Sequence, residues 1–241
     1  MKFVSFEYRG KASYGLWQDE NHWLQVPAAF AAQYPDLKSV VSADQLDALE
    51  AAAIQSGEAV KASDARLLPV IANPGKVFCV GLNYKTHVAE MKRADSEHPA
   101  IFTRFADSLS AHGAPLPKPA ATQRFDFEGE LAVIIGKEGR NIAEADAFDH
   151  VAGYSCYNDG SIREWQFHAK QIASGKNFES TGGFGPWMVT ADEIAPNQQL
   201  KLVTRLNGEV VQSSHTGHMI FSIAKLISYA STIFTLVPGD V

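Results

Sequence analysis

The chain has 241 residues, of which 46% are hydrophobic and 20% are charged, as in an ordinary soluble globular protein. Its formal net charge is −6, and the sequence contains no basic cluster that would neutralise a phosphate backbone. These properties argue against a nucleic-acid partner, and they require that small anions be held by local groups.

The first part of the chain is predicted to form a small β-meander followed by a helix. Short runs of alternating apolar and polar residues, broken by turn residues, predict strands at 3–8, 13–17 and 23–26. The segment Ser42-Ala-Asp-Gln45 has the pattern of a capping box, which predicts a helix that begins there and extends through Ala53.

A domain boundary is expected at Asn73-Pro-Gly75, between a small domain over residues 1–72 and a larger one over residues 73–241. The larger part mixes strands with short helices and lacks regular βα alternation. That pattern favours a strand-rich α+β fold over a doubly wound or TIM-type fold. Within it, Asn207-Gly208 predicts a β-hairpin with a type I′ turn.

Nothing in the sequence predicts a membrane or secretory destination. The most hydrophobic stretch, residues 219–237, is interrupted by Lys225 and is expected to be a core helix rather than a membrane span. The N-terminal residues have no long apolar core and carry Glu7, so no signal peptide is expected. Cys79 and Cys156 lie in apolar surroundings and are expected to be buried free thiols of a reducing compartment. We therefore expect a cytoplasmic protein.

Two glutamates separated by one glycine open the apolar run of residues 131–136. Because side chains alternate along a strand, Glu128 and Glu130 are expected to project from one face. Both faces of the run are apolar, so the two carboxylates would repel each other unless a cation accompanies them. Mg²⁺, Mn²⁺ or Ca²⁺ fits better than zinc, since no paired Cys or His is nearby. The alternative is an exposed strand end with two solvated glutamates.

A third acid, Asp159, lies at an expected turn before a predicted helix over residues 161–168. It can be a further metal ligand or simply the cap of that helix. Arg163 and Gln166 follow on one face of the helix and can reach the same pocket. Lys176 lies in a loop that must turn tightly, and only these neighbours distinguish it from a solvated surface charge.

The predicted strand over residues 77–80 leads into a segment that carries His87 and Glu90. On a helix these two share a face, so the carboxylate can orient the imidazole as an acid/base pair, and the alternative is a surface ion pair. Arg104 lies in the apolar run of residues 102–105. Its guanidinium can bind a substrate carboxylate, or it can form an ion pair at an interface or at the edge of the core.

Taken in order along about residues 70–241, these segments resemble the fumarylacetoacetate hydrolase family. The ordered set carries the resemblance, since no single motif is very specific. Its members are Gly81-Leu-Asn-Tyr84 with His87 and Glu90, Phe127-Glu128-Gly129-Glu130-Leu131, Tyr157-Asn-Asp159 with Arg163 and Gln166, Gly175-Lys176-Asn177-Phe178 with Gly185-Pro186, and Leu236-Val-Pro-Gly-Asp240. The resemblance implies a compact mixed β-roll or sandwich domain that forms a homodimer.

The resemblance also implies a divalent-metal enzyme. Glu128, Glu130 and Asp159 would be the ligands of Mg²⁺, with Mn²⁺ or Ca²⁺ as alternatives. His87 with Glu90 would be the acid/base dyad.

The remaining implied residues face a small anionic 2-oxo or diketo acid. Lys176 would be a catalytic cation near the substrate oxygens, and Arg163 and Gln166 match substrate-contacting positions. Tyr84 and Arg104 are further candidates for substrate binding.

The expected reaction is hydrolysis of a carbon–carbon bond in a 2,4-diketo acid, such as an acylpyruvate, through a metal-bound enolate. Alternatives within the same family are an isomerase or hydratase of unsaturated 2-oxo acids and an oxaloacetate decarboxylase. Family members continue beyond the position of Val241 with a strand and a Thr-Gly-Thr-Pro loop. A catalytically silent metal-binding homologue is therefore a further alternative.

Overall fold

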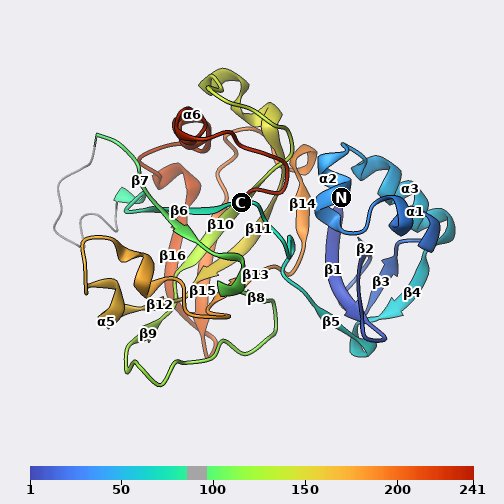
Figure 1. Ribbon diagram of the computed structural model, residues 1–241, viewed down its shortest axis with the longest axis horizontal. Helices are drawn as coiled ribbons and strands as arrows, with labels where there is room; N and C mark the ends of the chain where they lie inside the picture. The colour runs from blue at the N-terminus through green and yellow to red at the C-terminus, as the bar shows by residue number, and fades with distance from the viewer. Residues whose placement is uncertain (86–96) are drawn as a thin grey trace.

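A computed structural model describes residues 1–85 and 97–241 and gives them a strand-rich α+β fold (Figure 1). The N-terminal third contains β1 (Lys2–Tyr8), β2 (Lys11–Trp17), β3 (His22–Gln25), α1 (Ala28–Gln33), α2 (Leu37–Ser42), α3 (Leu46–Ser56), β4 (Glu58–Lys61) and β5 (Ala65–Leu67). Strands β1 to β4 pair antiparallel in chain order, which confirms the predicted meander.

The predicted start of the helix was wrong. Helix α2 ends at Ser42 and α3 begins only at Leu46, where Gln45 makes no side-chain cap. The capping box lies earlier, because the Asp36 carboxylate accepts a 2.7 Å hydrogen bond from the Ser39 amide and the Asp36 amide donates to the Ser39 hydroxyl. A left-handed φ of 56° at Asp44 turns the chain between the two helices.

The rest of the chain builds the larger part of the molecule. Its elements are β6 (Val77–Gly81), β7 (Ala100–Arg104), β8 (Leu109–Ala111), β9 (Phe125–Asp126), β10 (Gly129–Ile135), β11 (Val151–Asp159), β12 (Ser161–Ile162), α5 (Arg163–Gln166), β13 (Gly182–Phe184), β14 (Met188–Thr190), β15 (Lys201–Leu206), β16 (Glu209–His215) and α6 (Ile223–Ile233). Among the described residues, the pairs β6–β7, β9–β12 and β15–β16 form small separate sheets.

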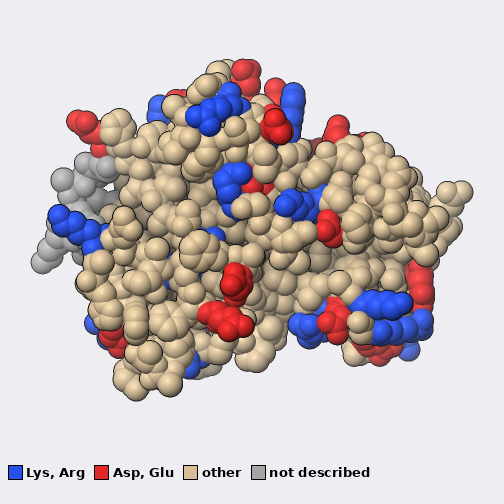
Figure 2. Space-filling view, in the orientation of Figure 1, with Lys and Arg blue, Asp and Glu red and all other residues tan. Residues whose placement is uncertain are grey.

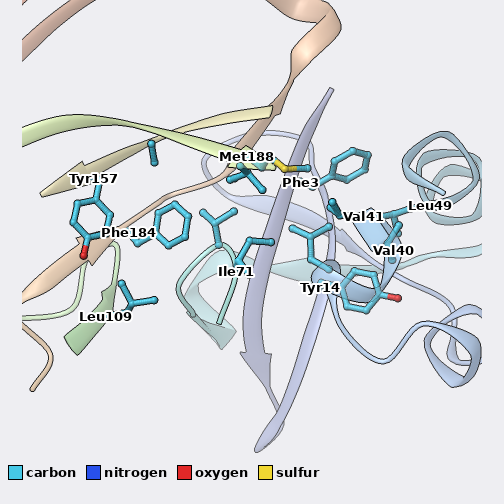
Figure 3. Close-up of a cluster of buried hydrophobic side chains, with 14 of the residues drawn as sticks. Phe3, Tyr14, Val40, Val41, Leu49, Ile71, Leu109, Tyr157, Phe184 and Met188 are labelled. Carbon is cyan, nitrogen blue, oxygen red and sulfur yellow. The ribbon is translucent and has the colours of Figure 1, made fainter. Parts of the chain in front are cut away.

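One sheet of ten strands runs through both parts of the described chain, in the order β4-β3-β2-β1-β14-β11-β13-β8, with β5 beside β1 and β10 beside β11. It crosses the expected boundary where β1 pairs with β14, with Phe3 opposite Met188. A buried core follows the same path, and Figure 3 shows Phe3 and Met188 lying between Leu49 on one side and Phe184 on the other. The N-terminal meander is thus packed onto the strands that carry the candidate site.

Two local predictions are confirmed in the C-terminal region. Asn207 and Gly208 have φ values of 52° and 86°, the left-handed pair that a type I′ turn between β15 and β16 requires. Helix α6 occupies the centre of the apolar stretch, over Ile223–Ile233, and Ser222 caps its first turn. No helix in the described part of the chain is long and apolar enough to cross a membrane.

Asp159 is the last residue of strand β11, not a turn residue before a long helix. It stays in the sheet because β11 pairs on both sides, with Asn158 opposite Gly129 of β10 and Asp159 opposite Gly182 of β13. In place of the predicted helix over residues 161–168, the chain forms only the single turn α5, which Asp159 does not cap.

The two cysteines are free but differ from the expected buried pair. Cys79 is partly buried in β6, whereas Cys156 is exposed, because its side chain points to the opposite face of β11 from the buried Ser155 and Tyr157. On the face shown in Figure 2, basic and acidic side chains are interspersed rather than gathered into one patch.

Candidate active site

Strand pairing brings the predicted carboxylates together. The Asp159 amide donates a 2.8 Å hydrogen bond to the Glu128 carbonyl, and the Glu128 amide donates to the Asn158 side chain at 3.0 Å. Glu130 lies two residues along β10, opposite Tyr157. The close pairing of β10 with β11 therefore brings Glu128, Glu130 and Asp159 into the same part of the molecule.

Lys176 lies at the centre of this acidic group. It follows a short 3₁₀ turn, and its ammonium donates to Glu128 Oε2 at 2.8 Å, Asp159 Oδ2 at 2.7 Å and Ser161 Oγ at 2.7 Å. Its side chain is only 2% exposed. All three ammonium donors are thus used in a nearly water-free setting, where charge-assisted hydrogen bonds are strong.

Arg163 and Gln166 approach the same group from α5. Arg163 Nη1 donates to Glu128 Oε1 at 2.6 Å and to Gln166 Oε1 at 2.9 Å. Its Nε and Nη2 atoms both donate to Asp126 Oδ2, at 2.9 and 2.8 Å. The Arg163 guanidinium thereby links Glu128 to Asp126 of β9.

Arg104, a candidate for substrate binding, makes its hydrogen bonds in this structure with the protein. Arg104 is 2% exposed, and its Nη1 atom donates to Asp159 Oδ1 at 2.5 Å and to the Gly160 carbonyl at 3.1 Å. The guanidinium lies behind the carboxylates, because the end of β7 carries it into the core. Of the two roles considered from the sequence, the buried ion pair is the one observed.

The surroundings of Glu128 and Glu130 shift the pKa values of the two carboxyl groups in opposite directions. Burial raises the pKa of Glu130 to about 8, and the nearby charges of Glu128 and Asp159 add to that effect. Burial also opposes ionisation of Glu128, but Lys176 and Arg163 outweigh it and lower its pKa. Glu128 is therefore anionic at neutral pH, whereas Glu130 holds a proton in the metal-free protein.

A cavity of about 190 Å³ opens over these groups. The carboxylates of Glu128, Glu130 and Asp159 line one side, together with Tyr84, whose pKa is raised to about 12 by burial and by Glu130. Apolar side chains line the rest, namely Val80, Leu131, Val133, Met219 and Ile223 among others. The predicted dyad, His87 and Glu90, lies outside the described residues.

The donor set fits a hard divalent cation in its chemistry. Within residues 1–85 and 97–241, no three Asp, Glu, His or Cys side chains already converge on one point, because the Lys176 ammonium lies between Glu128 and Asp159. A carboxylate offers about four lone-pair positions, and the single hydrogen bonds to Glu128 Oε2 and to each Asp159 oxygen leave acceptor capacity there. Burial is the main cause of the raised Glu130 pKa, and a cation beside Glu130 would offset the like-charge crowding that adds to it.

Three supporting residues were not predicted. Ser161 and Asp126 lie two residues from Asp159 and Glu128 respectively, a spacing that a strand-based interpretation could have used. Gln212 comes from the hairpin, where its amide accepts from the Gly129 N–H at 2.9 Å and donates to the Gly129 carbonyl at 2.8 Å. It fixes the residue between the two glutamates, and no local sequence signal indicates that long-range contact.

Comparison with known families gives one match to a large part of the chain. A family model described as the C-terminal domain of fumarylacetoacetate (FAA) hydrolase matches residues 76–241. A mitochondrial oxaloacetate tautomerase of Xenopus laevis is 42% identical over 181 residues, which are 74% of this chain and 57% of that protein. A human mitochondrial oxaloacetate tautomerase is 41% identical, over 74% of this chain and 58% of its own length. The chain thus spans a little over half the length of these relatives.

Solved structures match along the whole chain. A fumarylacetoacetate hydrolase from Exiguobacterium antarcticum has a TM-score of 0.85 and 32% identity, covering 100% of this chain and 84% of that one. A maleylpyruvate hydrolase from Sphingobium, solved with manganese(II) and pyruvate, has a TM-score of 0.82 and 25% identity, covering 100% and 86%. A 2-hydroxyhepta-2,4-diene-1,7-dioate isomerase from Mycobacterium marinum has a TM-score of 0.76 and 26% identity, covering 100% and 84%.

Proposed function

Because the family model covers well over half of its residues, the chain belongs to the fumarylacetoacetate hydrolase family, and we propose that it stabilises the enolate of a small 2-oxo acid with the help of a divalent metal. The observation that carries this proposal is the buried group of Glu128, Asp159 and Lys176, with Glu130 beside it. Such a group combines acidic oxygens for a cation with a fixed positive charge for an anionic substrate.

In this proposal Glu128, Glu130 and Asp159 hold the metal, and Mg²⁺ or Mn²⁺ is the expected ion. A bound divalent cation polarises a carbonyl oxygen and stabilises the negative charge that develops on it. Lys176 supplies a second, preorganised positive charge at the same place. Arg163 and Gln166 orient the substrate at the rim, and Tyr84 offers a phenol that stays protonated at neutral pH.

The leading reaction is tautomerisation of an oxaloacetate-like acid. Support comes from relatives of 41 to 42% identity that are oxaloacetate tautomerases. The same residues serve a second candidate, hydrolysis of a 2,4-diketo acid, since cleavage also expels an enolate. Hydrolysis needs a base that activates water, and His87 with Glu90 is the proposed dyad. A similarity to maleylpyruvate hydrolase supports this alternative.

The test uses the protein stripped of metal with EDTA and then supplied with Mg²⁺ or Mn²⁺. Interconversion of enol and keto oxaloacetate is followed by ultraviolet absorbance, against a blank without protein. Acetylpyruvate is incubated in parallel, and pyruvate and acetate are identified by NMR. Metal-dependent acceleration with oxaloacetate alone supports the tautomerase, whereas metal-dependent acetate from acetylpyruvate supports the hydrolase.

Variants connect the activity to the site. Glu128→Gln is expected to abolish metal-dependent turnover, whereas Glu209→Gln, an exposed change in the hairpin, leaves it intact. Thermal stabilisation by metal without turnover of either acid would support a catalytically silent homologue. Absence of both metal binding and turnover would refute the proposal.

We also infer that the protein acts as a cytoplasmic homodimer whose small N-terminal domain, residues 1–72, supports the catalytic part. Light scattering coupled to size-exclusion chromatography measures the mass in solution. A mass of twice 26.2 kDa is expected, and a monomer at micromolar concentration would contradict the dimer. Fractionation of the source cells tests the location.

A further inference from the structure

Arg104 makes a complete set of buried hydrogen bonds behind the acidic group. Its Nε atom donates to Ser108 Oγ at 3.2 Å, and Nη2 donates to Thr181 Oγ1 at 2.9 Å and to the Ser108 carbonyl at 3.5 Å. Nη1 donates to Asp159 and Gly160. All five N–H groups therefore have acceptors, which only the planar fork of a guanidinium can arrange.

The acceptors of this fork are themselves held in place. Ser108 Oγ donates to the Phe105 carbonyl at 2.7 Å, and Thr181 Oγ1 donates to the Phe178 carbonyl at 2.7 Å. Gly182 leaves room for the guanidinium, because a Cβ atom there would lie 2.8 Å from Arg104 Nη2. Ser108 and Thr181 are buried, so the guanidinium has one orientation and is not free to turn toward a substrate.

The two oxygens of Asp159 have different partners as a result. Oδ1 is bound by Arg104, and Oδ2 is bound by Lys176 on the side of Glu128. We propose that Arg104 is a positioning residue, which holds Asp159 Oδ1 and so fixes the carboxylate that would hold the divalent cation, with Oδ2 toward Lys176. This inference rests on the proposed function, because it assumes that Asp159 is a metal ligand.

If Arg104 acted only through its charge, its removal would change the metal affinity in the direction opposite to that expected for a positioning residue. Arg104 is a cation, so its removal would relieve Coulomb repulsion and strengthen the binding of another cation nearby. A positioning role predicts weaker binding, because Asp159 loses the partner that fixes its carboxylate. Outer partners of metal ligands commonly contribute tenfold to 100-fold to metal affinity. The sign of the change therefore separates the two roles.

The experiment measures Mn²⁺ binding to the metal-free full chain by titration calorimetry and by the Mn²⁺ EPR signal. Arg104→Lys keeps the charge and loses the fork, and it is expected to raise the Kd about tenfold. Arg104→Gln is expected to raise it by about 100-fold. Thr181→Val removes one acceptor of Nη2 and is expected to raise the Kd about threefold, less than the range for direct partners of a ligand, because Thr181 acts through Arg104. Arg66→Lys, in an exposed pair with Glu7, is the matched control.

Each of the following results would overturn the inference. One is an unchanged or lower Kd in a folded Arg104→Lys or Arg104→Gln protein. Another is an increase in KM for oxaloacetate at an unchanged Mn²⁺ Kd, which would make Arg104 a substrate contact. If Arg104→Gln does not fold, Arg104→Lys decides, and an unchanged Kd in that variant overturns it. A wild-type protein that binds no Mn²⁺ overturns the proposed function together with this inference.

Discussion

At the scale of single residues, the candidate site depends on how a few buried charges are paired. Lys176 and Asp159 have almost no contact with water, and each is satisfied by partners that come from other strands or loops. Removing one partner from such a set leaves an uncompensated buried charge, which costs more than the pair itself contributes. Variants in the site therefore need a measure of stability beside each measure of activity.

Lys176→Gln is expected to lower kcat by about 100-fold, because the fixed charge that stabilises a developing enolate is lost. The affinity for Mn²⁺ is expected to stay the same or to increase, since a cation between Glu128 and Asp159 has been removed. Steady-state kinetics and calorimetry on the same sample measure both effects, and Lys201→Gln on the exposed face of β15 is the control. Unchanged kcat would exclude a catalytic role for Lys176.

The raised pKa of Glu130 predicts a pH dependence of stability in the metal-free protein. The folded state holds a proton up to about pH 8, whereas an unfolded glutamate releases it near pH 4.5. The folded protein binds more protons across this window, so its free energy of unfolding falls as the pH rises through it. Glu130→Gln removes the effect and is expected to raise the melting temperature at pH 8 by roughly 10 °C.

Thermal melts between pH 5 and pH 8.5, with EDTA present, check this expectation. The wild-type melting temperature should decrease relative to that of Glu130→Gln over the range. Glu209→Gln should follow the wild type, because Glu209 is exposed. Parallel curves for wild type and Glu130→Gln would show that Glu130 is ionised in the folded protein.

At the scale of elements, the hairpin β15–β16 supports the start of β10, beside Glu128 and Glu130. Gln212 binds both backbone groups of Gly129, and Thr204 Oγ1 donates to Gln212 Oε1 at 2.9 Å. A Cβ atom on Gly129 would lie 2.2 Å from Thr204 Oγ1, so only glycine permits this approach. Because Gly129 has no side chain, the hairpin can pack directly against this part of β10.

Gln212→Ala is expected to weaken Mn²⁺ binding by about tenfold, because Gly129 loses two hydrogen bonds and the adjacent glutamates lose their fixed spacing. Calorimetric titration with Mn²⁺ measures the change. Gln33→Ala on the exposed end of α1 is the control, since its amide donates an exposed hydrogen bond to the neighbouring tyrosine hydroxyl. Equal affinities for the two variants would show that the hairpin does not support the site.

At the scale of the whole molecule, one sheet and one core join the N-terminal meander to the site. Phe3 and Met188 lie in the same buried cluster as Leu49 and Phe184 (Figure 3). Unfolding of the meander would expose β14. That strand pairs with β11, and β11 carries Asp159. The two parts are therefore expected to unfold together.

Phe3→Ala is expected to lower the free energy of unfolding by about 3–5 kcal/mol, the usual cost of removing a buried aromatic side chain. Tryptophan fluorescence reports chiefly on the region around Trp17, Trp23 and Trp187, and circular dichroism reports on all strands. The two signals should give one coincident transition at a lower denaturant concentration than in the wild type. Two separate transitions would show that the parts are independent.

The sequence by itself determined features that depend on near neighbours. Alternation of apolar and polar residues specifies the strands of the meander, Asn207-Gly208 specifies the hairpin turn, and Glu128-Gly-Glu130 specifies two acids at the start of β10, although Glu128 lies just before the strand. Each follows from side-chain periodicity or from the backbone preferences of a turn. The ordered motifs also identified the family, which the match over residues 76–241 confirms.

Only the tertiary structure decided how distant segments pair. Asp159 remains in a strand because β10 and β13 bind β11 on both sides, and that pairing overrides the local preference of Asn-Asp-Gly for a turn. Arg104 faces inward because Asp159 and Thr181 accept its hydrogen bonds from 55 and 77 residues away. Such contacts are fixed by burial and by the need to satisfy buried polar groups, properties of the folded core that no local pattern records.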